Sequence, residues 1–491
     1  MRFWAVSLVC AATGCAQIFG LDVTTGAPDA NLDKASLQIQ RVSVGATVQK
    51  NPQDMSGQMA TFYQDDGAGG LTAVPGELGP APMDTFTAPL NMGTPPVKFD
   101  FPPPNNQNFF FAFPGRAQKG TFVVYEHPNP TAADPAAAIM LSATLPTPYV
   151  TGESFQLLAV GAWTNRALGA ADLPAPDLGN STIAPAAAIP YSSFGAMFGA
   201  TMKNKIIASD YLLLLRYQNN KLTGVMQSQF EQSTGTDPVS GAVTPNNTTA
   251  TAVNIPIDPT GFSTRYSAVR PAPGAMSMSY SINAAPGWSI LNQTGIQLAA
   301  GGNAMTDSML TTSYGNPFES LMWKTVLTFS TSTPRMTPFM HMGMPVSLGA
   351  GMYQLQIQDP ANTLTLPAPL PITVRIANQA LTTDGMSVTI DVTKPIEVKA
   401  DLDKTTAPTA LGVNVDELTS TGARMRVLNA LGIGPDSITL PPNTFAAGKT
   451  YVIQYVTYQG GYPNAMSGDL QTQALPLSVA YLDSGVFTVA P

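Results

Sequence analysis

The sequence is poor in the side chains that carry out most chemistry. Its 491 residues include only two cysteines, Cys10 and Cys15, and only two histidines, His127 and His341. Because both cysteines lie near the N-terminus, the rest of the chain can form no disulfide, thiolate nucleophile or cysteine metal site. The Gly-x-Ser-x-Gly and His-Glu-x-x-His signatures of serine hydrolases and zinc peptidases are also absent. We therefore predict a protein that is not an enzyme and has no cofactor.

Charged residues are also scarce. They make up 11% of the chain, with 23 Lys and Arg against 31 Asp and Glu and a net charge of −8, whereas an average protein has roughly 25% charged residues. The basic residues form no cluster, which argues against a nucleic-acid partner. Beyond the N-terminus, no apolar run approaches the roughly 20 residues that a membrane-spanning helix requires.

Proline and glycine, in contrast, are abundant, with 44 and 42 residues. They separate short runs of aromatic and β-branched residues, such as the run 108–113, which stops at Pro114 and Gly115. Elsewhere apolar and polar residues alternate, as Leu37 and Ile39 do with their neighbours. Short runs of this kind between turn residues are typical of β-sandwiches. The predicted fold class is all-β, with tandem sandwiches.

The spacing of these runs predicts four β-rich blocks. Their expected ranges are 36–130, 131–285, 286–370 and 371–491. In the second block, the compositions of 169–200 and 233–251 predict long loops, and the alanine-rich stretch 132–141 leaves a helix open. The last block has the most regular pattern, and we expect strands at 372–376, 387–392, 396–400, 411–418, 424–428, 437–440, 451–458 and 486–489.

The N-terminus has the layout of a secretory signal, with Met1-Arg2 followed by an apolar run and small residues before Cys15. The sequence Ala12-Thr13-Gly14-Cys15 resembles the lipobox of bacterial lipoproteins. This resemblance implies that residues 1–14 are a cleaved signal peptide and that Cys15 carries the lipid. It also implies an outer-membrane lipoprotein of the cell envelope, facing the periplasm or the surface and bound to the membrane by its lipid anchor. Residues 15–35 lack any period and are predicted to be a flexible tether.

A second resemblance lies in the last block. The segment Phe445-Ala-Ala-Gly-Lys-Thr-Tyr451, followed by an alternating run, resembles the E–F corner of fibronectin type III domains, whose pattern is Leu-x-Pro-Gly-x-x-Tyr. Gly448 and Tyr451 occupy the matching positions, while Phe445 replaces the Leu and Ala447 replaces the Pro. The resemblance implies an Ig-like sandwich over 371–491, in which the Tyr451 hydroxyl reaches back to the backbone and its ring fills the corner.

One short segment is rich in soft metal ligands. Met336, Met340, His341, Met342 and Met344 place four thioethers and one imidazole within nine residues. Such donors suit Cu(I), and the segment is similar to the Met- and His-rich loops of periplasmic copper-binding sandwiches. In a continuous strand, however, Met340, Met342 and Met344 would share one face and His341 would point the other way. That geometry favours the alternative interpretation, in which the methionines are part of the core.

The acidic residues give a weaker signal. Asp401, Asp403, Asp416 and Glu417 fall near one end of the last block, where calcium could use their oxygens, but their spacing matches no calcium loop. Solvated turn residues are the simpler interpretation of these acids.

These observations lead to three functional hypotheses. The first is a non-enzymatic cell-envelope lipoprotein with a structural, adhesive or ligand-binding role, whose partner is an unidentified envelope or extracellular protein or glycan. The second is a copper-binding protein that uses Met340–Met344. The third is an envelope glycan hydrolase, in which two acids distant in sequence converge in space.

Overall fold

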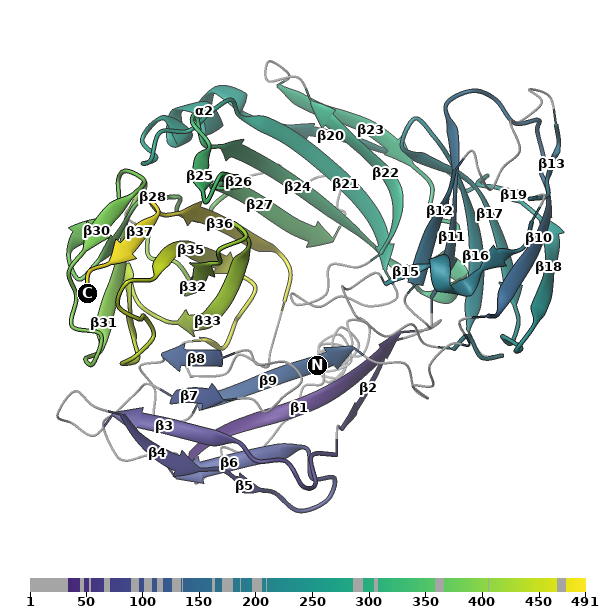
Figure 1. Cartoon of the computed structure of the whole chain (residues 1–491). Helices are drawn as coiled ribbons and strands as arrows, with labels where there is room; N and C mark the ends of the chain where they lie inside the picture. The colour runs from purple at the N-terminus through teal and green to yellow at the C-terminus, as the bar shows by residue number, and fades with distance from the viewer. Residues whose placement is uncertain are drawn as a thin grey trace, which may run out of the picture.

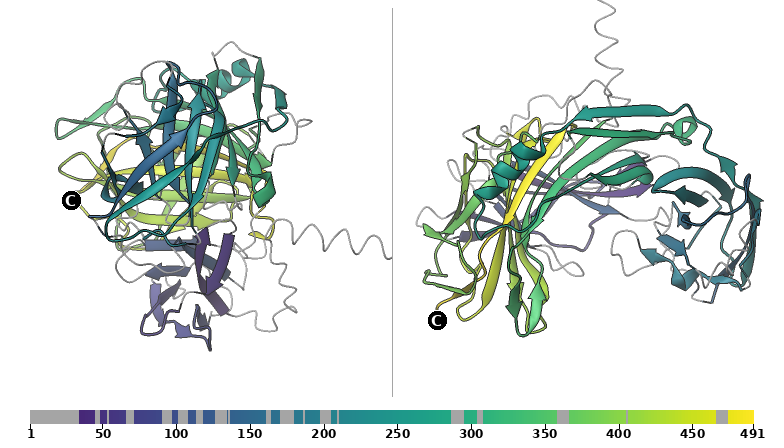
Figure 2. Two further views of the ribbon diagram at one scale, coloured as in Figure 1. Left: turned by 90° about the vertical axis from the view of Figure 1, so that its right-hand side faces the viewer. Right: turned by 90° about the horizontal axis from the view of Figure 1, so that it is seen from above.

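The structure is a computed structural model, and it describes residues 34–491 with several gaps. The residues outside the description are 1–33, 45–47, 53, 66–70, 90–96, 101–107, 113–117, 126–133, 135, 161–163, 170–179, 186, 197–204, 209, 286–294, 304–307, 358–365, 405 and 466–473. Strands dominate the described part, so the predicted all-β, sandwich-like fold is confirmed (Figure 1). Seen from above, the sheets follow a curved path from the C-terminal strands to the second block (Figure 2). No helix in this part of the chain has the length and apolar character needed to span a membrane.

The first block contains nine strands in its described residues. They are β1 (Lys34–Val44), β2 (Val48–Pro52), β3 (Thr61–Asp65), β4 (Leu71–Pro75), β5 (Glu77–Leu78), β6 (Thr85–Pro89), β7 (Val97–Asp100), β8 (Asn108–Ala112) and β9 (Gln118–Tyr125). β1 is central, because it pairs antiparallel with β2 and β6 and parallel with β9. Ala35, Leu37 and Ile39 are buried and the residues between them are half-buried, which is the alternation that predicted a strand here.

The second block is a two-layer sandwich. Its strands are β10 (Ala138–Thr144), β11 (Glu153–Ala159), β12 (Thr164–Leu168), β13 (Thr182–Ile183), β14 (Ile189–Pro190), β15 (Gly195–Ala196), β16 (Tyr211–Gln218), β17 (Lys221–Gln229), β18 (Thr236–Ala242) and β19 (Thr244–Pro245). β16 was expected to be a central strand covered on both faces, and all of its leucines are buried. Leu212 and Leu214 belong to one hydrophobic cluster, while Leu213 and Leu215 belong to another. The continuous apolar run therefore reflects burial on both sides of the sheet.

Two local expectations for this block were wrong, and one alternative that the sequence left open can be decided. The stretch 132–141, for which a helix was left open, leads into the strand β10. The segment 169–200, expected to be a loop, contains β13, β14, β15 and the 3-10 turn η1 (Tyr191–Ser193) in its described residues. The segment 233–251 contains β18, which pairs in parallel with β10 over seven positions. These non-local ladders organise sequences whose composition alone is typical of loops.

The third region adds a broad antiparallel sheet and one α-helix. Its elements are β20 (Thr251–Pro256), α2 (Pro259–Ser267), β21 (Ser277–Ala285), β22 (Ile296–Asn303), β23 (Met309–Tyr314), η2 (Glu319–Leu321), β24 (Lys324–Pro334), β25 (Phe339–His341), β26 (Met344–Val346) and β27 (Gly349–Ile357). The helix was not predicted. Asp258 caps it by accepting a hydrogen bond from the Gly261 amide at 2.9 Å, and Pro259 occupies the first turn.

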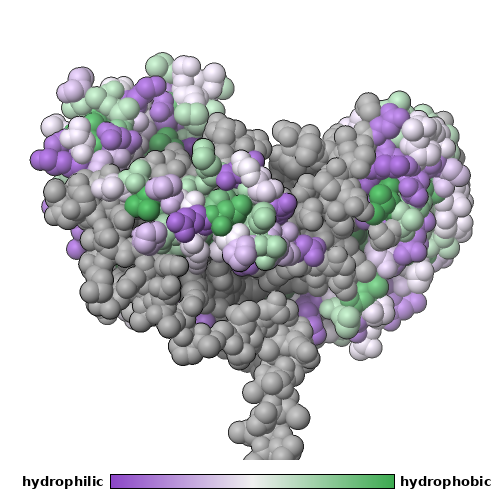
Figure 3. Space-filling model, turned by 90° about the horizontal axis from the view of Figure 1, so that it is seen from below, coloured by the Kyte–Doolittle hydropathy of each residue, from purple (hydrophilic) through white to green (hydrophobic). Residues whose placement is uncertain are grey.

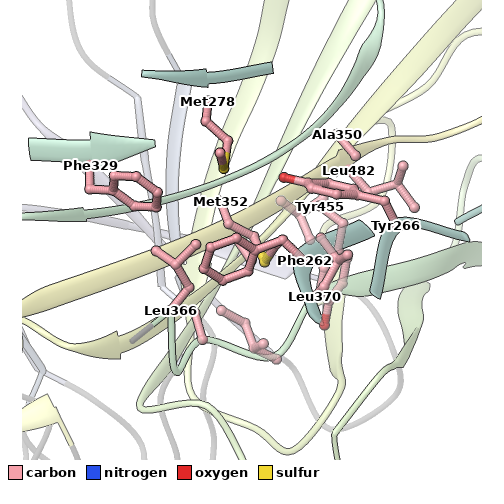
Figure 4. Close-up of a cluster of buried hydrophobic side chains, with 14 of the residues drawn as sticks. Phe262, Tyr266, Met278, Phe329, Ala350, Met352, Leu366, Leu370, Tyr455 and Leu482 are labelled. Carbon is pink, nitrogen blue, oxygen red and sulfur yellow. The ribbon is translucent and has the colours of Figure 1, made fainter. Parts of the chain in front are cut away.

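The helix α2 packs on the sheet through two aromatic residues. Figure 4 shows Phe262 and Tyr266 facing Met352 of β27 within the main hydrophobic cluster. The Tyr266 hydroxyl also donates a hydrogen bond to the Thr331 carbonyl at 2.9 Å. Arg265 on the same helix forms an ion pair with Asp403, so the helix is attached to the C-terminal block as well.

The C-terminal block is a sandwich closed by the last strand of the chain. Its strands are β28 (Pro371–Ile376), β29 (Gln379–Ala380), β30 (Met386–Val388), β31 (Ile396–Leu402), β32 (Ala410–Leu418), β33 (Arg424–Gly432), β34 (Ser437–Leu440), β35 (Thr450–Gly460), β36 (Leu477–Asp483) and β37 (Phe487–Val489). One layer has the order β29-β28-β31-β34, and the other includes β33, β32, β35 and β36. Buried residues of both layers, such as Val398 and Val413, belong to the same cluster. The strand β36 was not predicted.

Hydrogen-bonded ladders cross the block boundaries expected from sequence. β21 pairs with β24 across the boundary at 285, and β27 pairs with β36 across the boundary at 370. β8 of the first block pairs in parallel with β33 of the last. The main hydrophobic cluster likewise extends from Leu158 to Val489.

On the coloured part of the face seen from below, hydrophobic residues occur only in small separate patches (Figure 3).

Candidate functional site: the methionine hairpin

The soft-ligand segment forms a tight β-hairpin, called here the methionine hairpin (residues 339–346). β25 and β26 pair antiparallel, with Met342 and Gly343 between them. Both of these residues have positive φ angles, 50° and 81°. Positive φ at both central residues is the geometry of the two-residue type I′ turn, whose twist matches that of the flanking strands. Gly343 adopts this conformation without steric cost, whereas Met342 is held in it by the hairpin.

The turn changes which side chains share a face. The register pairs His341 with Met344 and Met340 with Pro345. Directly opposed residues in an antiparallel pair point to the same face. His341 and Met344 therefore lie side by side, and Met340 lies on the opposite face. The continuous-strand geometry expected from sequence, with His341 facing away from Met344, was wrong because the strand reverses between them.

The methionines of this segment are exposed. The exposed fractions are 69% for Met336, 54% for Met340, 72% for Met342 and 54% for Met344. These values contradict the interpretation that the methionines are core residues. His341 is half-buried, and its ring stacks on that of Phe339 at a centroid distance of 6.4 Å.

Other residues of the hairpin fix it to the C-terminal sandwich. Val346 is buried with Leu418 and Val452 in a small hydrophobic cluster, and Phe339 packs against it. The tip of the hairpin lies on the turn between β32 and β33. A Cβ atom on Gly422 of that turn would come within 2.7 Å of the Met344 Cβ, so the two loops approach closely only because residue 422 is glycine.

The base of the hairpin is held by Arg335. Its backbone amide donates to the Leu348 carbonyl at 3.1 Å, which closes the loop that contains the hairpin. Its guanidinium forms an ion pair with Asp384 and donates to the Asp483 carbonyl at 3.0 Å and to the Ser484 carbonyl. Since this guanidinium is almost fully buried, its partners offset the cost of removing the charge from water.

Four charged residues and one glutamine lie beside this base: Asp416, Arg424, Arg426, Gln454 and Asp483, called here the Arg424 cluster. The Arg424 Nη2 atom lies 2.6 Å from Asp416 Oδ2 and 3.1 Å from Asp483 Oδ1. The other guanidinium, that of Arg426, binds Asp416 Oδ1. Asp483 Oδ2 accepts from the Gly349 amide at 3.0 Å, and Gln454 Nε2 lies 3.3 Å from Asp483 Oδ1. All four carboxylate oxygens thus have partners.

This arrangement bears on the glycan hydrolase hypothesis. Asp416 and Asp483 are the buried acids that share a cation, so they form a converging acid pair. Glycoside hydrolysis needs one carboxylic acid that can protonate a leaving group and a second that can reach the sugar. Here every oxygen accepts from a guanidinium, amide or backbone donor, and both carboxylates are buried. The pair joins strands, and its geometry does not favour acid–base chemistry.

The acids considered for calcium binding are also paired with bases. Asp401 binds Arg375 at 2.8 Å, and Glu417 binds Lys449 at 2.9 Å. Asp403 binds Arg265, and its Oδ1 accepts from the Leu370 amide at 2.6 Å. Among the described residues, no three His, Cys, Asp or Glu side chains gather as a metal site would require. Of the two metal sites considered from the sequence, the methionine hairpin therefore remains the candidate.

The Tyr451 region has a corner-like geometry. The Tyr451 hydroxyl accepts a hydrogen bond from the Ala446 amide at 2.9 Å, and its ring packs edge-on against Phe445 at 5.1 Å. Gly448 has a φ of +76°, and its amide donates to the Val489 carbonyl in β37 at 2.8 Å. Burial raises the pKa of the Tyr451 hydroxyl, and the hydrogen bond from the Ala446 amide partly offsets this increase.

Cys15 and His127 lie outside the described residues.

Sequence reasoning missed the arginines that fix the hairpin. Arg335 and Asp384 are 49 residues apart, and Arg424 and Asp483 are 59 apart. No local pattern links residues at such separations. Gly343, by contrast, was a visible turn signal within the methionine segment and could have indicated the hairpin.

Comparisons with known proteins give no family assignment. No protein-family model matches the chain, and no curated protein matches its sequence. Two similar solved structures are trypsin-activated α2-macroglobulin from Escherichia coli, with 8% identity and a TM-score of 0.14, and the elastase-activated form, with 10% and 0.15. The alignments cover 91% and 93% of this chain. The chain spans only 29% and 43% of the length of those two structures.

Proposed function

We propose that this protein is a non-enzymatic lipoprotein of the cell envelope, anchored by Cys15, whose β-sandwiches serve a structural, adhesive or ligand-binding role. The observation that carries the proposal is the position of Cys15 after a basic start, an apolar run and Ala-Thr-Gly. The first described strand begins at Lys34, which leaves residues 16–33 between the proposed lipid and the fold. The partner we propose is an envelope or extracellular protein or glycan.

Two features support a non-enzymatic role. The described residues contain one histidine, His341, whose ring stacks on Phe339 and forms no hydrogen bond or ion pair with an acid of that part of the chain. The buried carboxylates of Asp416 and Asp483 are bound by arginines that connect strands of one sheet. Charges used in this way stabilise the relative positions of strands and offer no free acid or base to a substrate.

The anchoring proposal is tested by membrane fractionation of cells that produce the full chain. We expect Cys15→Ala to move the protein from the membrane to the soluble fraction, because a multiply acylated cysteine would be the whole anchor. Cys10→Ala is the matched control, since Cys10 lies inside the proposed signal peptide and should leave anchoring unchanged. Mass spectrometry of the native protein should show acyl chains on Cys15. Retention of the Cys15→Ala variant in salt-washed membranes would contradict the proposal.

The non-enzymatic proposal has a separate test. The purified protein should release no reducing ends from isolated envelope glycans. If it does release them, and Asp483→Asn abolishes this activity while the variant remains folded by circular dichroism, the hydrolase hypothesis is correct and ours is wrong.

A further inference from the structure

We propose that the methionine hairpin binds a soft monovalent metal ion, Cu(I), through the imidazole of His341 and the thioethers of Met344 and Met342. This site goes beyond the anchoring role, and neither proposal depends on the other. The structure supplies what the sequence pattern could not, because it places His341 and Met344 on one face of the hairpin.

The geometry is compatible with a shared ion. Directly opposed residues in an antiparallel pair have Cβ atoms roughly 5 Å apart. Two ligands on one metal ion need donor atoms within about 4 Å of each other, given bond lengths of about 2.0–2.3 Å. The flexible Met344 side chain has three rotatable bonds and can bring its sulfur to the His341 ring. Met342 begins the turn directly after His341 and is the most exposed methionine of the hairpin.

Exposure alone does not distinguish these methionines. Ten of the eleven large hydrophobic side chains that are exposed in the described part of the chain are methionines, including Met59 in the first block. The methionine hairpin differs from the other exposed methionines because the His341 imidazole lies beside the Met344 thioether. His341 is the one histidine among the described residues, and its partner across the hairpin is Met344.

The donor set selects the metal. Thioethers are soft ligands that favour Cu(I), and imidazole also binds copper, whereas hard cations such as calcium and magnesium require oxygen ligands. Within the described residues, no cluster of three His, Cys, Asp or Glu side chains offers a competing site for zinc.

The surrounding structure limits the cost of ordering the ligands. The Phe339 ring stacks on His341, and Val346 is buried at the foot of the hairpin. Arg335 closes the base of the loop through its bonds to Leu348 and Asp384. Since the hairpin backbone is fixed before the metal arrives, binding has to order only side chains.

The test is a titration of Cu(I) against a chromophoric Cu(I) chelator under reducing conditions; the parent is the full-length chain with Cys10→Ala and Cys15→Ala, because free thiolates would also bind Cu(I). We expect the parent to compete with the chelator at one equivalent. His341→Ala and Met344→Leu should each weaken binding by at least about tenfold, a loss seen even for outer-shell partners of metal ligands. Met342→Leu should weaken it to a similar extent. Leucine keeps the volume and apolar character of methionine, so these variants remove the sulfur with little change in packing.

Two matched controls make the assignment specific. Met340→Leu alters the opposite face of the same hairpin, and Met59→Leu alters an exposed methionine of the first block. Both should bind Cu(I) as the parent does. Ag(I), a redox-inert probe, should shift the ¹³C-methyl resonances of Met342 and Met344 and leave that of Met340 in place.

Several results would overturn the proposal. They are failure of the parent to compete for Cu(I), equal loss in Met340→Leu and Met344→Leu, and unchanged binding in both His341→Ala and Met344→Leu. Circular dichroism melts check that each variant is folded. If Met344→Leu proves unstable, Met342→Leu, at a more exposed position, decides the question alone.

Discussion

The guanidinium of Arg424 on β33 binds the carboxylate of Asp483 on β36 at 3.1 Å, although two other strands separate these strands in the sheet. The same guanidinium binds Asp416 on β32, one of the two intervening strands. A second contact links Asp483 to the Gly349 amide, at the start of β27. Asp483 thus connects Arg424 to the start of the strand that follows the methionine hairpin.

Arg424→Ala should destabilise the protein by roughly 3 kcal/mol, because it leaves the buried Asp483 carboxylate without its cation. The change should appear as a lower calorimetric transition temperature of the full chain. Arg375→Ala is the matched control. Arg375 pairs with Asp401, and both side chains are more than a third exposed, so this loss should cost less than about 1 kcal/mol. Equal effects of the two substitutions would show that the Arg424 cluster does not hold the sheet together.

Tyr451→Phe should destabilise the C-terminal block by about 1 kcal/mol, the usual net value of a hydrogen bond. The bond lost is the one from the Ala446 amide at 2.9 Å. Tyr451→Ala should cost about 3–5 kcal/mol, because the ring fills a space beside Phe445 and Phe487. Urea unfolding of the full chain measures both, since β36 of this block pairs with β27 and a fragment would lose that ladder. A Phe variant as stable as the parent would show that the hydroxyl contributes nothing.

The fold class and many strands could be predicted because their sequences alternate. In β1, for example, Leu37 and Ile39 are buried, while the polar residues Ser36 and Gln38 are half-buried. The strand β36 lacks this signal: Ser478 and Ala480 are buried as well as Leu477 and Val479, since both faces of the strand are covered. Both faces of β16 are buried too, but its unbroken run of leucines predicted a strand, whereas Ser478 interrupts the apolar run of β36.

The residues of the candidate site could be predicted from the sequence, but their arrangement in space could not. The soft-ligand residues were identified, but their placement assumed an unbroken strand through Met342 and Gly343. The positive φ angles of those two residues reverse the chain and bring His341 opposite Met344. The arginine contacts that hold the hairpin join residues far apart in sequence, which local patterns cannot show.

Gly422→Ala should disturb the contact between the methionine hairpin and the β32–β33 turn. Its φ of +78° disfavours a side chain, and the new Cβ would lie 2.7 Å from the Met344 Cβ. Gly385→Ala is the matched control, because Gly385 has the same φ and no atom within 4 Å of the added Cβ. Both variants should lose about 1 kcal/mol for the backbone conformation. Gly422→Ala should lose more, by calorimetry, and equal losses would mean that the two loops are not in contact.

Stability should fall as the pH rises above about 10, because buried tyrosines resist ionisation in the folded state. The pKa of Tyr191 is raised from 10.0 to about 12, mainly by burial; the Thr164 hydrogen bond partly offsets this increase, and the nearby Asp210 charge adds to it. A folded-state pKa above the unfolded value means that the stabilisation is complete below pH 10 and is lost progressively between pH 10 and 12.

Each such tyrosine should raise the unfolding equilibrium constant by about tenfold per pH unit within this window. Burial also raises the pKa values of Tyr217 and Tyr266, so their contributions add to that of Tyr191. The measurement is the urea midpoint as a function of pH, with tyrosinate absorbance as a second readout. Tyr191→Phe removes one titrating group, and its stability should decline less steeply with pH than that of the parent. Identical pH slopes for parent and variant would show that Tyr191 ionises as readily in the folded protein as in the unfolded chain.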